Sequence, residues 1–224
     1  MRTGLKIVLG MGVVAIALFW WFSNPARAPK GKQGNTPSTS SAVQVVAQTE
    51  NQLESELEET SMITEFTNAQ EADLWRSVDD GVMGGVSDST FTVTPAETGV
   101  FSGELSLENN GGFTSVRRSV EDVDFAGARA IALRIKGDGR PYQFRLQTKT
   151  ANDSLSYRAE FETNADGWME VSLPIADFEP VFRGRVIADA PKLTPDEVKQ
   201  IGFLLADKQP GAFKLETDWI RIER

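Results

Sequence analysis

From residue 64 to residue 224, apolar and polar residues alternate in short runs that are separated by turn residues. Neighbouring side chains of a strand point to opposite faces, so in residues 130–136 the side chains of Ile131, Leu133 and Ile135 share one face. Many such runs at this spacing are typical of a β-sandwich. We therefore predict an all-β domain of about nine or ten strands. The clearest runs are residues 90–94, 104–107, 113–120, 130–136, 143–148, 156–162, 168–173, 201–205 and 213–222.

The last of these runs changes its alternation part-way along. Phe213 and Leu215 lie at odd positions, whereas Ile220 and Ile222 lie at even positions. An extra residue in one strand of an antiparallel pair produces such a change of parity. The pattern predicts a β-bulge at residues 217–219.

One segment carries the signals of a helix start. Thr194 is of the type found at helix N-caps, Pro195 suits the first helical position, and Glu197 stands where a capping-box glutamate belongs. The sequence therefore predicts that a helix begins at residues 194–197.

An uncharged apolar segment lies near the N-terminus. Residues 7–22 contain no charge and end in two phenylalanines and two tryptophans, with basic residues on both sides. A helix of this length spans about 24 Å, somewhat less than the ~30 Å core of a bilayer. Cleavage as a signal peptide is possible after residues 26–28, but Pro29 would follow the cut, and the aromatic cluster suits a membrane interface. We expect an uncleaved single-pass anchor or signal segment over residues 1–23, with the globular domain on the periplasmic or lumenal side.

The next segment has the composition of a tether. Residues 24–41 are rich in Pro, Gly, Ser, Thr and Lys, and residues 33–74 carry eight acids and no base. Such a segment has too little apolar surface to fold by itself. A sparse apolar stripe over residues 44–60 permits a short, marginal helix, although a solvated linker is the commoner form. We predict a flexible acidic linker over residues 24–63.

The composition excludes several classes of function. The chain has no histidine and no cysteine, so it lacks the usual proton shuttle, the thiolate nucleophile and most transition-metal ligand sets. Residues 75–224 hold 18 basic and 24 acidic residues, a net charge of −6, which argues against a nucleic-acid partner. We expect no enzymatic activity, no cofactor and no metal site.

Three glycine-rich polar loops are the most distinctive part of the sequence. They are residues 79–85 (Asp-Asp-Gly-Val-Met-Gly-Gly), 109–113 (Asn-Asn-Gly-Gly-Phe) and 137–142 (Gly-Asp-Gly-Arg-Pro-Tyr). Glycine tolerates positive φ and close backbone approach, so these loops either turn sharply or touch a partner.

Each loop has a structural and a binding interpretation. Asp79 and Asp80 could share a proton, ligate calcium or contact a partner, but an aspartate among glycines more often hydrogen-bonds its own turn. Residues 109–112 are typical of a hairpin turn, although their backbone could also face a ligand. Asp138 and Arg140 favour turn chemistry with a local ion pair.

Arginines recur on the polar faces of the predicted strands. If the strands that carry Arg134, Arg145 and Arg158 are neighbours, one sheet has an outer face lined by arginine and glutamine. A planar guanidinium recognises carboxylates or sugar hydroxyls, whereas the alternative is a solvated face paired with glutamates. Arg183 and Arg185 flank a glycine and are the best single candidate for binding an anionic or polar ligand. The candidate ligand- or partner-binding residues are therefore Asp79, Asp80, Met83, Gly84, Gly85, Asn110, Gly112, Asp138, Arg140, Arg145, Arg183 and Arg185.

The same motifs carry a family resemblance. From about residue 66 to residue 223, the chain resembles the complex I intermediate-associated protein 30 family. The resemblance rests on landmarks that occur in one order along the chain. They are Trp75, residues 79–85 with Ser87, residues 101–103, residues 109–113, residues 137–140 with Tyr142, Phe161 with Trp168, residues 173–174 with 177–178, and residues 182–185.

The resemblance implies a galactose-binding-like β-sandwich, or jelly roll, a fold shared with carbohydrate-binding modules. It also implies a non-enzymatic assembly factor or chaperone, a role best known from respiratory complex I biogenesis. Because a membrane segment stands where a mitochondrial relative has an import sequence, we expect a bacterial membrane-anchored member. Its partner would be a protein client, such as a membrane complex or its assembly intermediates. The alternative is a carbohydrate-binding module that acts on envelope glycans.

Overall fold

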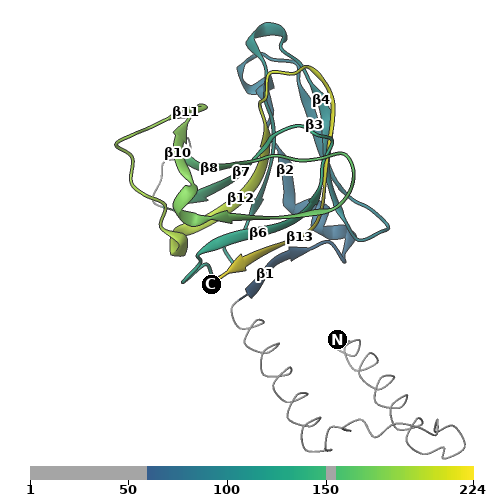
Figure 1. Cartoon of the computed structure of the whole chain (residues 1–224). Coiled ribbons are helices and arrows are strands. Elements are labelled where there is room, and N and C mark those ends of the chain that lie inside the picture. The colour runs from purple at the N-terminus through teal and green to yellow at the C-terminus, as the bar shows by residue number, and fades with distance from the viewer. Residues whose placement is uncertain (1–59, 150–154) are drawn as a thin grey trace, which may run out of the picture. The chain divides into compact units, whose positions relative to one another are not determined.

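The computed structural model describes residues 60–149 and 155–224, and they form two packed antiparallel β-sheets. In Figure 1, β1, β6 and β13 lie together in one sheet, and β7, β8 and β12 lie together in the other. Within this described part, no helix is long and apolar enough to cross a membrane. The predicted anchor over residues 1–23 and nearly all of the predicted linker lie outside the described residues.

The six-stranded sheet is organised around its longest strand, β13. The order is β3-β4-β13-β6-β9, and β1 also pairs with β13. Residues 211–217 of β13 pair with β4, and residues 219–223 pair with β1, so these two strands follow one another along the same edge of β13. The strands are β1 (Thr60–Glu65), β3 (Asp88–Val93), β4 (Gly99–Leu105), β6 (Ala130–Lys136), β9 (Met169–Pro174) and β13 (Gly211–Glu223).

The seven-stranded sheet has the order β11-β10-β8-β7-β12-β5-β2. The alternating pattern of β7 is visible in its burial, because every second side chain from Tyr142 to Thr148 is buried. The strands are β2 (Trp75–Ser77), β5 (Thr114–Ser119), β7 (Tyr142–Thr148), β8 (Leu155–Phe161), β10 (Glu179–Phe182), β11 (Arg185–Val186) and β12 (Val198–Leu205).

Short 3-10 helices link the strands. They are η2 (Ala69–Leu74), η3 (Asp80–Met83), η4 (Glu108–Asn110), η5 (Ile175–Asp177) and η6 (Pro195–Glu197). The helix predicted at residues 194–197 is therefore a single turn, and Thr194 makes no side-chain cap hydrogen bond. The predicted start is confirmed, since Thr194 stands at the N-cap position and Pro195 is first in the helix, but the helix ends after one turn because Val198, Ile201 and Phe203 bury their side chains in β12, which begins directly after it.

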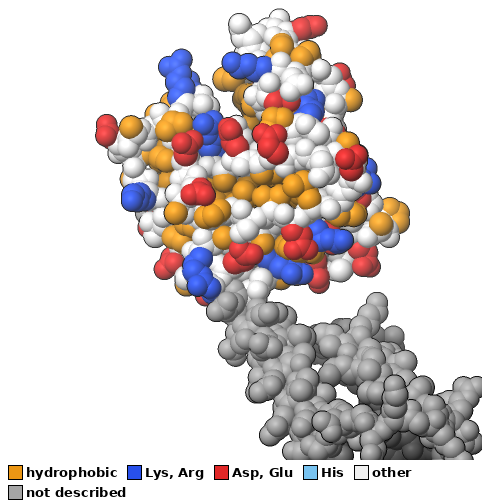
Figure 2. Space-filling model, in the orientation of Figure 1, with side chains coloured by type: hydrophobic (Ala, Val, Ile, Leu, Met, Phe, Trp, Pro, Cys, Tyr) orange, Lys and Arg blue, Asp and Glu red, His pale blue; other side chains and the backbone are white. Residues whose placement is uncertain are grey.

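The core lies between the two sheets and is rich in aromatic rings. Trp75 stacks between Phe91 and Phe203, with ring centroids 4.3 and 5.9 Å away. Phe66 and Tyr142 are also fully buried. Stacked and tilted ring pairs of this kind stabilise a core beyond the burial of their area. On the surface, Figure 2 shows hydrophobic side chains gathered in a band across the middle of one face, with charged side chains above and below it.

The structure confirms the all-β sandwich and revises details of it. The described residues form thirteen strands, more than the nine or ten predicted, because short edge strands such as β2 and β11 escape pattern recognition. The first strand begins at Thr60, within the predicted linker. The predicted bulge is confirmed, since the register of β13 against β6 shifts between Thr217 and Trp219.

Candidate functional site

A buried carboxylate joins two of the glycine-rich loops. Asp80 is fully buried, and its side chain accepts hydrogen bonds from the backbone N–H of Ser87 (2.9 Å), the hydroxyl of Ser87 (2.6 Å) and the backbone N–H groups of Gly112 (2.6 Å) and Phe113 (3.4 Å). We call Asp80 with these donors the Asp80 junction. The hydroxyl oxygen of Ser87 also accepts from the backbone N–H of Ser106 (2.9 Å), which ties the end of β4 to the same point.

The glycines of both loops leave room for this carboxylate. A Cβ at Gly85 would collide with the side chain of Asp80, and a Cβ at Gly111 would lie 2.5 Å from its Oδ2 atom. Gly84 has φ +93° and Gly112 has φ +127°, values that residues with a side chain rarely adopt. The two motifs therefore form one hydrogen-bonded unit in three dimensions.

This unit corrects the hairpin prediction for residues 109–112. The segment joins β4 to β5, and these strands belong to different sheets. Asn109 and Asn110 both have positive φ, at 54° and 61°. Residues 106–113 are therefore a connection between the sheets, held by Asp80.

The neighbouring carboxylate also bonds within the fold. Asp79 accepts from the hydroxyl of Ser89 (2.7 Å) and from the backbone N–H of Ser115 (3.0 Å). Burial raises the pKa of Asp79 above its ordinary value, against the effect of these hydrogen bonds. Burial acts in the same direction on Asp80, but the hydrogen bonds from Ser87, Gly112 and Phe113 outweigh it and hold the pKa of Asp80 below its ordinary value.

Apolar side chains project outward around the Asp80 junction. Val82 is 73% exposed, Met83 61%, Val86 52% and Leu107 44%. We call these four residues the loop apolar cluster. They lie on the two loops that Asp80 ties together, at the ends of β3 and β4 that are uppermost in Figure 1. The junction thus gives a rigid base to side chains that the core does not cover.

The third glycine-rich loop has its charged groups bonded within the domain. Arg140 makes a bidentate ion pair with Asp207, with N–O distances of 2.8 and 2.9 Å, and also donates to the carbonyls of Gly211 and Ala212. The hydrogen bonds that Arg140 donates to Asp207 raise the pKa of Arg140. Asp138 accepts from the hydroxyl of Tyr142 (3.0 Å) instead of forming the expected ion pair with Arg140.

Arg183 and Arg185 lie on an exposed hairpin. Residues 183 and 184 are the two central residues of the turn between β10 and β11, and both have positive φ. The guanidinium of Arg183 lies 5.5 Å from the ring centroid of Phe182. The structure brings neither arginine into register with Arg145, which lies two strands away from β10.

Arginines from four strands align across the outer face of the seven-stranded sheet. Arg76 of β2 pairs in register with Arg117 of β5, and Arg117 pairs with Gly202 of β12. Gly202 pairs with Arg145 of β7, which in turn pairs with Arg158 of β8. Directly paired residues of neighbouring strands share a face. We call Arg76, Arg117, Arg145 and Arg158 the arginine row.

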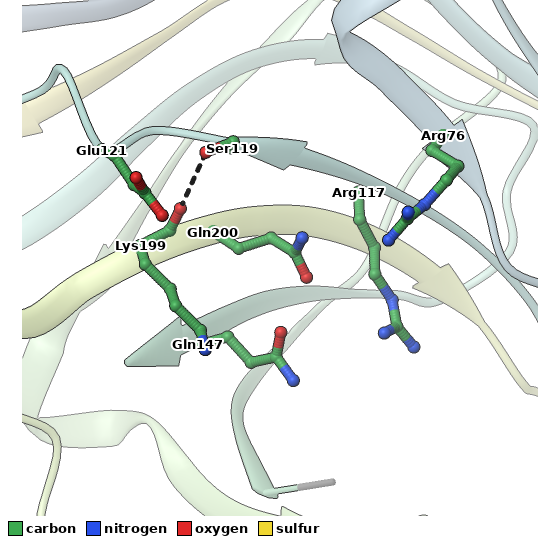
Figure 3. A pocket seen from close by; sticks show the side chains of 7 residues that line it. All are labelled: Arg76, Arg117, Ser119, Glu121, Gln147, Lys199 and Gln200. Carbon is green, nitrogen blue, oxygen red and sulfur yellow. Dashed lines mark hydrogen bonds between the residues drawn. The ribbon is translucent and has the colours of Figure 1, made fainter. Parts of the chain in front are cut away.

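A polar hollow of about 390 Å³ lies beside this row. Its lining residues are Arg76, Arg117, Ser119, Glu121, Gln147, Lys199 and Gln200. Figure 3 shows Arg76 and Arg117 together at one end, Lys199 and Gln147 at the other, and the amide of Gln200 between them. The sequence prediction placed Arg134 on this face, but Arg134 belongs to β6 of the other sheet and pairs with Asp218.

Arg76 and Arg117 were not predicted as site residues, because only the pairing of β2 with β5 brings them side by side. The alternation of Val116, Arg118 and Val120 could have placed Arg117 on the polar face, but it does not give the order of the strands. In the part of the chain that the structure describes, no group of three or more His, Cys, Asp or Glu side chains is placed to hold a metal ion.

Solved structures similar to this fold include carbohydrate-binding modules. A family 11 module from Clostridium thermocellum, in complex with a mixed-linked β-1,3-1,4 tetrasaccharide, matches with a TM-score of 0.57 at 16% identity, over 73% of this chain and 95% of that one. The family 11 module of the cellulase Lic26A-Cel5E of the same organism also has a TM-score of 0.57, at 17% identity. At this identity the likeness concerns the fold alone.

Curated relatives share the sequence more closely. Complex I intermediate-associated protein 30 of Mus musculus is 27% identical over 187 residues, which cover 74% of this chain and 57% of that protein. An uncharacterized protein of Schizosaccharomyces pombe is 30% identical over 169 residues, which cover 66% of this chain and 76% of that protein. The chain thus spans little more than half the length of the mouse relative. Because the family model matches residues 64–217, well over half of the sequence, this chain belongs to the Complex I intermediate-associated protein 30 family.

Proposed function

We propose that this chain is a membrane-tethered, non-enzymatic assembly factor that binds an assembly intermediate of a membrane protein complex through the loop apolar cluster. The observation that carries the proposal is the exposure of Val82, Met83 and Val86 on a loop fixed by a buried carboxylate. The family supports this role, because its curated relatives are named for association with a complex I intermediate and not for a reaction.

The physical argument concerns the free energy of binding. A protein interface loses affinity when loops must be ordered on contact, and a loop that is already fixed avoids much of this cost. Three hydrogen-bond donors on residues 87 and 112 hold the Asp80 carboxylate at 2.6–2.9 Å, so the loop is ordered before it meets a client. Met83 adds an adaptable apolar contact, because methionine has a flexible and polarizable side chain.

The tether is part of the same proposal. The uncharged segment over residues 7–22 would anchor the chain, and residues 24–59 would give the domain reach over the membrane surface. We propose a periplasmic or lumenal position for the domain. A reporter fused after Arg224, active on only one side of the membrane, tests this position; activity of a reporter specific to the cytoplasm would overturn it.

Affinity capture tests the client. The full chain, captured from detergent-solubilised membranes, should enrich several subunits of one membrane complex together. Changing Val82, Met83 and Val86 to Ser should remove this enrichment, because the contact area becomes polar. The matched control is Val186→Ser on β11, an exposed valine of similar exposure (48%) that lies outside the cluster. Equal enrichment by the triple variant would refute the proposed surface.

Glycan binding is the second candidate function, favoured by the fold that the chain shares with carbohydrate-binding modules. It is weaker because the outward side chains that lie along the arginine row on β5, β7, β8 and β12 include no aromatic ring on which a sugar could stack. Binding of the purified chain to envelope polysaccharides, at millimolar ligand concentration, tests it directly.

A further inference from the structure

We propose that the arginine row is a second binding surface, which takes an extended acidic segment of a polypeptide across the strands of the seven-stranded sheet. The inference deepens the proposed function and rests on it, because the acidic segment would belong to the client. It adds a site of different chemistry from the loop apolar cluster.

In the part of the chain that the structure describes, three arginines of the row have no ion-pair partner. Arg118 faces Glu71 at 2.5 Å, Arg140 faces Asp207, and Arg134 faces Asp218. Among the described residues, by contrast, Arg76 and Arg117 face no carboxylate, and Arg145 donates only to the neutral side chains of Gln143 (3.1 Å) and Ser156 (2.9 Å). Arg118, Arg134 and Arg140 are thus neutralised by carboxylates, whereas the half-buried guanidinium groups of Arg117 and Arg145 are not.

The pKa values of Arg117 and Arg145 are both lowered, as expected for arginines without a carboxylate partner. Burial, together with the nearby charges of Arg158 and Arg117, lowers the pKa of Arg145 to about 10, and the charge of Glu160 acts in the opposite direction without offsetting them. Burial and the charge of Arg76 likewise lower the pKa of Arg117. Each arginine therefore destabilises the charged state of its neighbour, and a carboxylate placed between them would relieve that repulsion.

The length of the row matches a short extended peptide. Neighbouring strands lie about 4.8 Å apart, so the row from Arg76 to Arg158 covers four steps, or roughly 19 Å, the length of about six extended residues. Gly202 stands at the middle of the row, where a Cβ would collide with the carbonyl oxygen of Val116. Gly202 therefore adds no side chain between Arg117 and Arg145, and because its own backbone is buried, a ligand would contact the two guanidinium groups and not the strand between them.

Carboxylates near the row limit where along it an anionic ligand can bind. Arg158 is paired with Glu179 (3.2 Å) and Glu160 (3.3 Å) at one end of the row, and Glu121 lies with Lys199 at the end of the hollow away from Arg76 and Arg117 (Figure 3). These carboxylates repel an anionic ligand beyond the row. The attractive stretch is therefore the part from Arg76 to Arg145.

The side chains around the arginines favour a polypeptide ligand over a sugar chain. The side chains beside the row are amides and hydroxyls, among them Gln143, Gln147 and Gln200. An amide side chain both donates and accepts hydrogen bonds, as a peptide backbone requires. An arginine fork binds a carboxylate in a bidentate manner, which gives affinity to Asp and Glu side chains on that backbone.

Fluorescence anisotropy with the purified full chain in a nonionic detergent tests the inference. The probe is a labelled peptide of about ten residues in which Glu alternates with Ser, a length sufficient to cover the row. We expect it to bind at least about tenfold more tightly than the same peptide with Gln in place of Glu, and to weaken as salt is added. Equal affinity for the Glu and Gln peptides would overturn the inference.

Variants locate the site. Arg117→Gln combined with Arg145→Gln should weaken binding of the Glu peptide at least about tenfold, whereas Lys at both positions should retain part of it because the charge remains. Arg134→Gln on the six-stranded sheet is the matched control and should leave the affinity unchanged. Thermal unfolding of every variant shows that the loss does not come from unfolding.

Two further outcomes have defined meanings. If an oligogalacturonate displaces the Glu peptide at lower concentration than the unlabelled peptide itself, the row is a site for acidic sugars, and the inference is wrong. If the Glu peptide binds as expected but no membrane complex is captured, the proposed function fails while the acidic-ligand site stands. The two hypotheses therefore fail separately.

Discussion

The Asp80 junction and the arginine row use charged side chains in opposite ways. At the junction, one buried carboxylate receives hydrogen bonds from Ser87, Gly112 and Phe113, all within its own domain. In the row, Arg76, Arg117 and Arg145 have no carboxylate partner among the described residues. The difference teaches that the distinctive acidic motif of this sequence serves the fold, whereas less conspicuous arginines leave charge available to a ligand.

The largest expected effect is at Asp80 itself. Asp80→Asn keeps the shape of the side chain but turns an amide N–H₂ group toward donors that need an acceptor. Buried groups left without partners cost about 1–3 kcal/mol each, so we expect the free energy of unfolding to fall by about 3–4 kcal/mol. Urea denaturation measures it; a loss below about 1 kcal/mol would show that the junction is not central to stability.

Loss of the Arg140 side chain should lower the free energy of unfolding almost as much. Arg140→Gln leaves the nearly buried carboxylate of Asp207 without its cation, and breaking a buried pair in this way costs about 3 kcal/mol. A double-mutant cycle with Asp207→Asn isolates the pair, because the two losses should be clearly less than additive. Additive losses would mean that the two side chains act independently.

The glycines of the first loop provide a matched comparison. Gly85→Ala places a Cβ against the Asp80 carboxylate and should lower the free energy of unfolding by about 2 kcal/mol. Gly81→Ala, four residues earlier, meets no atom within 4 Å and should be nearly neutral. Similar unfolding curves for the two variants would contradict the packing described for the junction.

The junction should also respond to pH. The folded-state pKa of Asp80 lies below its unfolded-state value of about 3.9, so its stabilising effect is complete above that value and is lost as pH falls through the folded-state pKa. The stability difference between the natural chain and Asp80→Asn should therefore be constant near neutral pH and shrink below about pH 4. Chemical denaturation at several pH values measures it. Both chains retain Asp79, whose raised pKa acts in the opposite sense. A difference that stays constant down to acidic pH would show that the carboxylate charge is unimportant.

The smallest expected change in the free energy of unfolding is a gain in stability. Arg145→Gln removes a half-buried charge that its neighbours repel, so we expect a gain of about 0.5–1 kcal/mol in the free energy of unfolding. The gain should diminish near 1 M salt, where the Debye length is about 3 Å. Arg158→Gln is the control, because Arg158 is already paired with Glu179 and its loss should not stabilise the fold. A clear loss of stability in Arg145→Gln would place this arginine with Asp80 and Arg140 as a structural residue.

Local pattern was sufficient for much of the fold. Alternation located the principal strands, and the change of parity between Leu215 and Ile220 located the bulge of β13. The pattern was insufficient where tertiary contacts override local preference: the capping signals at Thr194 located the start of a helix, but that helix is a single 3-10 turn, because the following residues are buried in β12. It failed for residues 109–112, whose hairpin signal belongs to a connection between two sheets.

By itself, the sequence determined the class of fold, the family and the exclusion of histidine and cysteine chemistry, since these depend on residue identity and on periods of two along the chain. Only the tertiary structure decided that Asp80 faces inward and that Arg117 stands beside Arg76 and across Gly202 from Arg145. The physical reason is that burial and register are relations between strands far apart in the sequence. A residue's type does not reveal whether its hydrogen-bond partners lie within its own domain or remain to be supplied by a ligand.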